Sequence, residues 1–151
     1  MKMSIRALAP WLLAAGLSVN LPAVAADTST SADGYVIHHN AFSADTLSPA
    51  IAQRYGIQRS KARGVLNVSV IKAKAGTTGT PVAAHVEVQA ASLTGQKQRV
   101  PMREVREQDA VYYLGEFPVK DQETLSFTIE VTPEGATKAI KGETSQQFFT
   151  K

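Results

Sequence analysis

Two adjacent histidines, His38 and His39, are the first residues with evident chemical potential, and His85 is the only other histidine in the chain. Imidazole can bind a metal ion or transfer a proton near neutral pH. A strand across Tyr35 to Phe42 would point the pair to opposite faces, because side chains alternate along a strand. One imidazole would then lie among apolar neighbours, where a hydrogen bond to a carbonyl or hydroxyl gives it a structural role. We therefore predict that the two histidines do not act as a pair.

A metal site built on these histidines needs ligands from elsewhere in the chain. His38 or His39 would have to converge with His85, Met102 or a carboxylate to hold copper or zinc. The sequence contains no ligand spacing that indicates such a site. Metal binding through the histidines is therefore the alternative prediction, and we predict no resident cofactor.

A second group of chemically capable residues lies in "RYGIQRSKARG", which contains four cations and no acidic residue. Arg59 and Lys61 could hold a phosphate, a lipid headgroup or a glycan carboxylate. They could equally form a solvated loop. Ser60 beside Lys61 does not indicate a serine-lysine dyad, because nucleophile and base must meet in space and neighbours in an extended loop diverge. We predict a protein without enzymatic activity.

The two groups define one candidate binding surface, between the first strand and the loop that precedes the second. Polar groups occur there where an ordinary sandwich would carry simpler residues. Its predicted members are His38, His39, Asn40, Arg59, Ser60 and Lys61.

The N-terminal residues predict an exported protein. Lys2 and Arg6 precede an apolar run and the small-residue site Ala23-Val24-Ala25, which is the pattern of a signal peptide covering residues 1–25. The apolar run is shorter than the roughly 20 residues of a transmembrane helix. Cleavage lowers the formal net charge from +3 to +1, which argues against a nucleic-acid partner. We predict a periplasmic protein.

The rest of the chain is predicted to form one domain at residues 34–151, after a flexible tail at residues 26–33. Its pattern is alternation of apolar and polar residues with turns about every ten residues, which favours an all-β antiparallel sandwich of about seven strands, immunoglobulin-like in type. One short helix interrupts the pattern between the first two strands, with Ser48 as its N-cap, Pro49 as its first residue and Gly56 at its end. The chain contains no cysteine, so no disulfide supports this fold.

Three segments, "YVIHHNAF", "YGIQRSKARGVLNVSV" and "YYLGEFPVKDQETLSFTIEVTPEG", together with a closing "FFT", resemble a family of small exported proteins of Gram-negative bacteria. That family is catalogued only as a domain of unknown function. The resemblance covers essentially the whole mature chain. It implies a periplasmic immunoglobulin-like sandwich and assigns no activity, cofactor or catalytic residue.

Together these observations favour a non-enzymatic binding or accessory module. The sandwich would present a surface or an open strand edge to a periplasmic protein or another envelope component. Scattered histidine, serine, lysine and carboxylate residues make an enzyme the weakest of the three classes considered.

Overall fold

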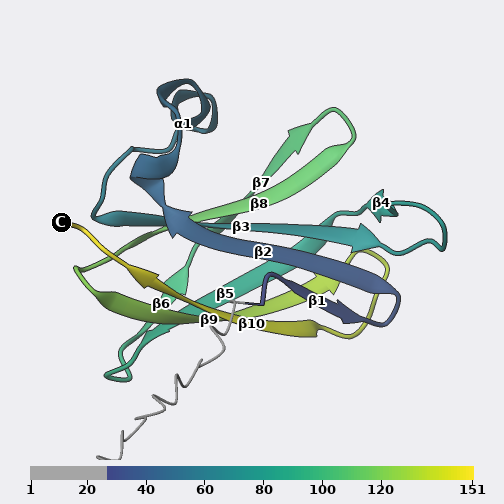
Figure 1. Ribbon diagram of the computed structural model, residues 1–151. Helices are drawn as coiled ribbons and strands as arrows, with labels where there is room; N and C mark the ends of the chain where they lie inside the picture. Colours follow the sequence, from purple (N-terminus) through teal and green to yellow (C-terminus); the bar gives the residue numbers. More distant parts are fainter. Residues whose placement is uncertain (1–26) are drawn as a thin grey trace, which may run out of the picture.

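Two antiparallel β-sheets face each other in the computed structural model, which describes residues 27–151. Figure 1 shows the two layers, with a short helix on the side of the upper sheet that faces away from the lower one. The predicted signal peptide lies outside the described residues. Within residues 27–151, no helix has the length and apolar character needed to cross a bilayer.

We call the two layers sheet A and sheet B. Sheet A has the order β1 (Ser29–Ala32), β2 (Tyr35–Ser43), β3 (Arg63–Lys72), β8 (Ala110–Pro118) and β7 (Met102–Glu107), and β4 (Thr80–Pro81) also pairs with β3. Sheet B has the order β10 (Ile140–Phe148), β9 (Glu123–Pro133), β5 (Ala84–Ser92) and β6 (Lys97–Val100). A 3-10 turn, η1 (Ala44–Thr46), and the helix α1 (Pro49–Tyr55) connect β2 to β3.

The main core lies between the sheets, where alternating residues of each strand meet. In β9, Leu125, Phe127 and Ile129 are all buried. The residues between them face outwards, as expected for a strand with one face exposed to solvent. The ring of Phe117 from β8 packs against that of Phe127 with centroids 5.0 Å apart. It also contacts Phe148 of β10 edge to face. Aromatic packing therefore joins the two layers at this end of the sandwich.

The helix α1 begins and ends where the sequence predicts. The side chain of Ser48 accepts a hydrogen bond from the backbone N–H of Ile51 at 3.3 Å, and Pro49 is the first helical residue. Gly56 has a left-handed conformation with φ 63°, which glycine adopts without a steric penalty. The N–H of Ile57 then reaches the carbonyl of Ala52. These caps fix the direction in which the chain leaves the helix.

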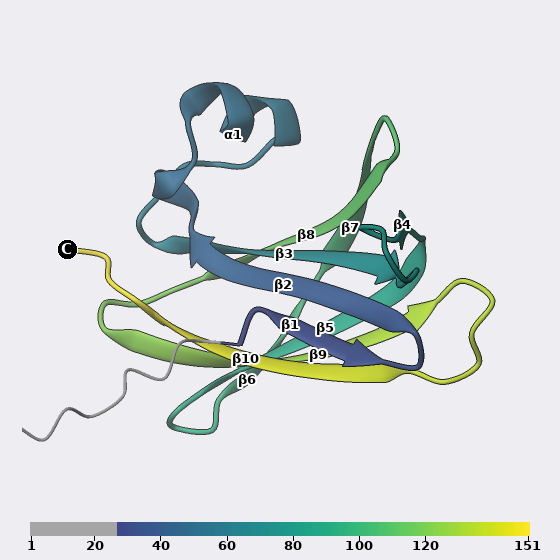
Figure 2. The same ribbon diagram turned by 45° about the vertical axis from the view of Figure 1, so that its right-hand side comes forward.

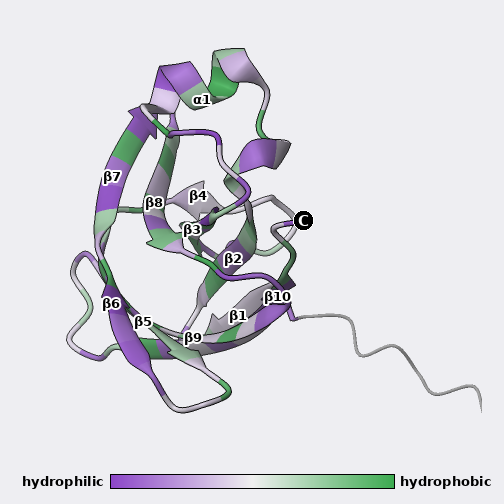
Figure 3. Ribbon diagram, turned by 90° about the vertical axis from the view of Figure 1, so that its left-hand side faces the viewer, coloured by the Kyte–Doolittle hydropathy of each residue, from purple (hydrophilic) through white to green (hydrophobic). Residues whose placement is uncertain are grey.

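The predicted strand near Arg99 to Glu107 is in fact two strands in different sheets. The chain leaves β6 in sheet B at Val100 and enters β7 in sheet A at Met102. Pro101 lies between them. Because proline has no backbone N–H to donate to a neighbouring strand, it fits a position where strand pairing ends. Figure 3 looks along the sandwich and shows β7 continuing from β6 along one edge, with β1, β2 and β10 near one another at the other.

The domain also starts earlier than predicted. Residues 29–32, predicted as part of a flexible tail, form the edge strand β1 and pair with β2. Asp33 and Gly34 join the two strands with φ values of 51° and 79°. Two consecutive residues with positive φ match the twist of a two-residue hairpin, and Asp-Gly is a preferred sequence for it.

The prediction of an all-β antiparallel sandwich with one short helix between the first two predicted strands is confirmed. The immunoglobulin-like topology stays a prediction. Figure 2 gives a second view of α1 standing over β2 and β3, clear of sheet B. The helix thus covers only one end of the outer face of sheet A.

Candidate functional site

A second, smaller core lies between α1 and the outer face of sheet A. Its buried members are Ala44, Ile57, Val65 and Leu114. Val65 and Leu114 are on β3 and β8, on the faces that point away from sheet B. These strands are therefore apolar on both faces at this end, since one face packs in the sandwich and the other under the helix.

This small core is incompletely filled and leaves an apolar pocket of about 210 Å³. Ile51 lies at its mouth with 37% of its surface exposed. The wall is apolar or aromatic except for one amide. The lining residues are Phe42, Leu47, Ile51, Tyr55, Ile57, Val65, Asn67, Tyr112 and Leu114. A pocket of this size is smaller than a typical drug-sized ligand site and matches a single bulky side chain.

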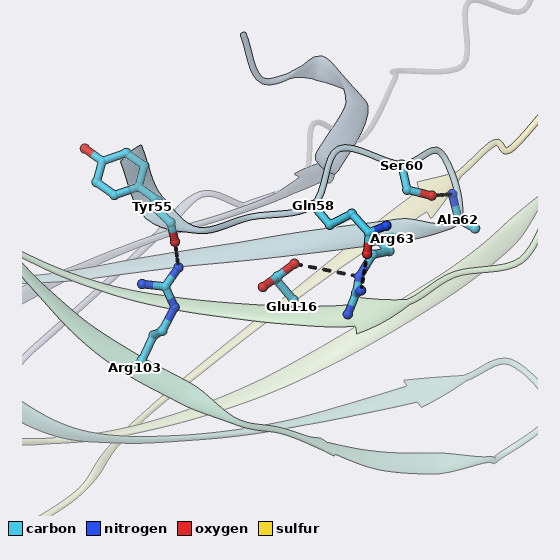
Figure 4. A network of polar contacts seen from close by, with 7 residues as sticks. All are labelled: Tyr55, Gln58, Ser60, Ala62, Arg63, Arg103 and Glu116. Atoms are coloured by element: carbon cyan, nitrogen blue, oxygen red, sulfur yellow. Dashed lines mark hydrogen bonds and ion pairs between the residues drawn. The ribbon is translucent and has the colours of Figure 1, made fainter. Parts of the chain in front are cut away.

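Polar contacts from β7 hold the helix over the pocket. The hydroxyl of Tyr55 donates a hydrogen bond to the Glu107 carboxylate at 2.8 Å. This bond raises the pKa of Tyr55. Arg103 donates to the backbone carbonyl of Tyr55, as Figure 4 shows, and Arg54 lies 3.6 Å from Glu107. Together these contacts fix the end of α1 to the edge of sheet A.

A polar hollow of about 330 Å³ lies beside the apolar pocket on the same sheet. It is lined by Thr28, His38, His39, Asn40, Asn67 and Ser69. In the strand register, His38 is opposite Ser69 and Asn40 is opposite Asn67. Asn67 lines both spaces. The outer face of sheet A therefore changes from polar to apolar across this one residue.

His39 is the buried member of the histidine pair, with 2% of its surface exposed, while His38 is exposed. Its Nε2 lies 3.3 Å from the hydroxyl of Thr30 in β1, and its Nδ1 has no hydrogen-bond partner within residues 27–151. Burial lowers the pKa of His39 by disfavouring the imidazolium, and the nearby Asp27 opposes this in part. His39 is thus a neutral structural histidine at neutral pH.

The predicted loop residues are engaged locally. Arg59 donates to the backbone carbonyl of Asp45 at 3.0 Å. The hydroxyl of Ser60 accepts a hydrogen bond from the N–H of Ala62 at 3.1 Å, and Figure 4 shows this turn next to Arg63. Lys61 is exposed. Ser60 therefore supports a turn of the chain, and the two cations point into solvent or hold η1.

The six predicted site residues form two groups. His38, His39 and Asn40 line the polar hollow, whereas the 59–61 loop precedes β3, next to the end of β2 at Ser43. His38 and Ser43 are five positions apart along an extended strand, a span of roughly 16 Å. No hydrogen bond or ion pair joins the two groups in the described part of the chain. The candidate surface as a single site remains a prediction.

The ligands weighed for a metal site are also divided. His85 and Met102 line one hollow together with Glu104 and Tyr113, but His39 lies in the polar hollow near the other edge of sheet A. Among residues 27–151, no three His, Cys, Asp or Glu side chains are grouped so that they could hold a metal ion. The convergence of His39 with His85 and Met102, which the metal prediction required, is not found.

The pocket residues were not predicted from the sequence, although a signal exists. Val65 and Leu66 are consecutive apolar residues in β3, and Tyr112, Tyr113 and Leu114 form a similar run in β8. Such a break in alternation indicates a strand buried on both faces. The segment from η1 through α1 to Ile57 covers this second face.

The fold and pocket define a β-sandwich domain with a helix-covered apolar pocket. The chain belongs to the DUF4426 family, a domain of unknown function whose sequence profile matches residues 29–151. A crystal structure of a DUF4426 family protein from Pseudomonas aeruginosa is 34% identical and superposes with a TM-score of 0.69, covering 82% of this chain and 94% of that one. The family resemblance predicted from the sequence is therefore confirmed. No curated protein matches the chain.

Two more distant structures share the fold. FetP from a uropathogenic Escherichia coli strain, expressed in the periplasm, has 13% identity and a TM-score of 0.60, with coverage of 83% of this chain and 95% of that one. A copper-bound variant of FetP has 11% identity and a TM-score of 0.58, with coverage of 82% and 95%. At this identity the likeness concerns the fold alone.

Proposed function

We propose that this protein is a non-enzymatic periplasmic binding module that takes a side chain of a partner protein into the apolar pocket beneath α1. The predicted signal peptide supports the compartment, and FetP, which shares the fold, was recombinantly expressed in the periplasm of Escherichia coli. The contact between the Thr30 hydroxyl and His39 involves an imidazole that is 2% exposed, which favours a structural role over catalysis. The pocket supplies the surface that a binding module requires.

The observation that carries this proposal is an apolar pocket held open by charged residues. Tyr112 and Leu114 of the sheet form its floor, and Ile51 of the helix leaves apolar surface at its mouth. The contacts of Glu107 and Arg103 with Tyr55 tie the end of α1 to β7. A preformed pocket that takes one bulky side chain is the usual form of an interface hot spot, because little ordering is required on binding.

The test is photo-crosslinking in living cells from two neighbouring positions of α1. A crosslinking amino acid replaces Ile51, which lines the pocket, and in a matched control replaces Ala50, which is exposed and does not line it. We expect a discrete crosslinked polypeptide from position 51 that is absent from position 50. Products common to both positions, or a lipid or glycan adduct at position 51, would overturn the proposal of a protein partner.

Metal binding is a second candidate function, favoured by the likeness of the fold to that of copper-bound FetP. His85 and Met102 would offer nitrogen and sulfur, the donors that suit copper, in the hollow they share. The described residues do not complete this set with a cluster of three ionisable ligands. The hollow around His85 and Met102 therefore suits a metal ion less well than the apolar pocket suits a partner's side chain.

A copper titration separates the two candidates. Met102→Leu and His85→Gln should each abolish stoichiometric Cu(I) binding if this hollow is a metal site, and His38→Gln should leave it unchanged. Equal copper uptake by all three variants and the unaltered protein would remove the metal candidate.

A further inference from the structure

The strand β6 covers only half of the edge of β5. β5 pairs with β9 along its whole length, from Ala84 to Ser92. It pairs with β6 only from Val88 to Ala91, because the chain then leaves sheet B and continues as β7 in sheet A. Figure 3 shows this passage at the edge of the sandwich. Within the described part of the chain, residues 84–87 of β5 therefore have no strand on this side.

The hydrogen bonds around β5 show which backbone groups face this open edge. The carbonyl of Ala83 accepts a hydrogen bond from the N–H of Glu134, directly after β9, so it faces β9. The N–H of Ala84 donates to the Tyr113 hydroxyl at 2.7 Å, on the other side. Because successive residues of a strand direct their backbone groups to opposite sides, the N–H and C=O of Val86 face the open edge. Neither meets a neighbouring strand within residues 27–151.

Tyr113 takes the place of the missing strand at Ala84 but not at Val86. Its hydroxyl accepts from the Ala84 N–H and in turn donates to the Glu104 carboxylate at 3.2 Å. The backbone of Val86 receives no comparable contact. A strand edge with free N–H and C=O groups pairs readily with another extended chain. The chemistry of this edge therefore selects a polypeptide segment as its occupant.

Two hollows lie along this edge, one after the other. The first has about 520 Å³ and lies between residues 84–86 and the start of β7, including Met102 and Glu104. The second has about 560 Å³ and lies between residues 81–83 and the hairpin of β7 and β8, including Arg106. The ion pair of Glu104 with Arg106 joins the walls of the two hollows. Together they form a groove along the line of β5, as an extended chain requires.

The two ends of the groove differ in chemistry. At one end, Val86 and Met102 are partly buried apolar side chains that pack against the main core. At the other, Asp109 and Glu134 line the wall, and no ion pair within residues 27–151 involves either of them. Arg106, the cation in that wall, already has an acidic partner. The groove therefore favours an apolar side chain at one end and a cation at the other.

We propose that this groove binds an extended segment of a partner polypeptide, which pairs antiparallel with β5 at Val86. The residue opposite Val86 is apolar and packs against Met102. A lysine or arginine about four residues further along, on the same face of the added strand, lies beside Asp109 and Glu134. This surface goes beyond the proposed function, because it lies at the edge between the sheets and does not depend on the pocket beneath α1.

Hydrogen exchange in the purified mature protein tests whether the edge is open. The Val86 amide should exchange at least about tenfold faster than the Val88 amide, which lies in the ladder between β5 and β6. Equal protection of the two amides in a monomer would overturn the proposal. Protection of Val86 that appears only as the protein dimerises would also overturn it, because the occupant would then be a second copy of this chain.

A synthetic peptide, acetyl-Ser-Thr-Val-Thr-Ser-Thr-Lys-amide, tests the strand pairing. Its control is the same peptide with the valine nitrogen methylated, which removes one backbone donor and keeps every side chain. We expect the unmodified peptide to shift the NMR signal of the Val86 amide and to bind about three- to tenfold more tightly, the range for one hydrogen bond. Equal binding of the two peptides, or no shift at Val86 at millimolar peptide, would overturn the proposal.

Val86→Pro removes the donor on the protein's side. The fold should persist, since proline is accepted where a strand's N–H faces away from its partner, and the unmodified peptide should bind about three- to tenfold more weakly. The methylated peptide keeps the proposal testable if this variant does not fold. Unchanged binding by a folded Val86→Pro protein would overturn the pairing at Val86.

A peptide with glutamate in place of lysine tests the charged end of the groove. The lysine peptide should bind about two- to fivefold more tightly at low ionic strength, the scale of an exposed ion pair. Asp109→Asn combined with Glu134→Gln should remove this preference. A preference that persists in the double variant would overturn the assignment of the cation to these two carboxylates.

Discussion

The hydroxyl of Tyr55 on α1 donates a hydrogen bond to the carboxylate of Glu107 on β7 at 2.8 Å, although 52 residues separate them in the chain. This bond and the contact between Arg103 and the Tyr55 carbonyl attach the helix to the edge of sheet A. It converts a two-turn helix, too short to be stable alone, into a fixed wall of the pocket.

Tyr55→Phe should loosen that wall without unfolding the sandwich. Loss of one hydrogen bond to a partly exposed carboxylate should lower the free energy of unfolding by about 0.5–1 kcal/mol. Amide hydrogen exchange across residues 49–56 should accelerate, while exchange in β9 stays unchanged. Tyr112→Phe removes the same hydroxyl from another wall of the pocket and should leave exchange in α1 unaltered. Equal exchange in both variants would show that Glu107 does not hold the helix.

His39 should make stability depend on pH. Because burial lowers its pKa below the ordinary 6.5, the unfolded chain takes up a proton near pH 6.5 while the folded protein does not. The unfolded state then holds more protons, and the free energy of unfolding decreases as the pH falls from about 6.5 towards the pKa of the folded state. Urea denaturation at pH 7.5 and pH 5.5 measures this effect.

Variants of His39 and His38 show which of the two histidines makes the stability depend on pH. His39→Gln should weaken the pH dependence of stability in this range. His38→Gln, on the exposed face of the same strand, should retain it. If both variants keep the full dependence, another group is responsible.

Gly64 in β3 should be sensitive to the addition of a single methyl group. A Cβ at this position would overlap the ring of Phe117, which is packed against Phe127 and Phe148. Gly64→Ala should therefore lower the free energy of unfolding by about 1–3 kcal/mol, the usual cost of overpacking. Thermal or chemical denaturation checks the value.

Phe117→Leu provides the companion to Gly64→Ala in a double-mutant cycle. The smaller side chain makes room for the methyl group, so the double variant should lose less stability than the sum of the two single variants. Strict additivity would show that the ring of Phe117 is not the cause.

Much of the fold follows from local patterns in the sequence. Alternation in residues 123–133 predicts β9, and Ser48 and Gly56 predict the ends of α1. The Asp33-Gly34 hairpin signal was present but was outweighed by the polar composition of residues 26–33, so β1 was missed. The switch between sheets at Pro101 depends on how the strands pair at long range, which alternation does not encode.

The candidate site was predicted less well than the fold. Polar residue types drew attention to His39, yet burial against Gly142 of β10 makes it structural. The apolar pocket was not predicted, because its walls come from β2, β3, β8 and α1, which are distant from one another in the sequence. Such a feature arises only when α1 covers the sheet, so tertiary structure was needed to find it.

The most direct test of the account is the affinity of the purified mature protein for the polypeptide crosslinked at position 51, measured for Ile51→Arg and Ala50→Arg beside the unaltered protein. A charged side chain at position 51 enters the mouth of the pocket, whereas one at position 50 extends into solvent. We predict that Ile51→Arg weakens binding at least about tenfold, the scale of an interface hot spot, and that Ala50→Arg binds normally. Equal affinities for all three proteins would contradict the assignment of the apolar pocket as the binding site.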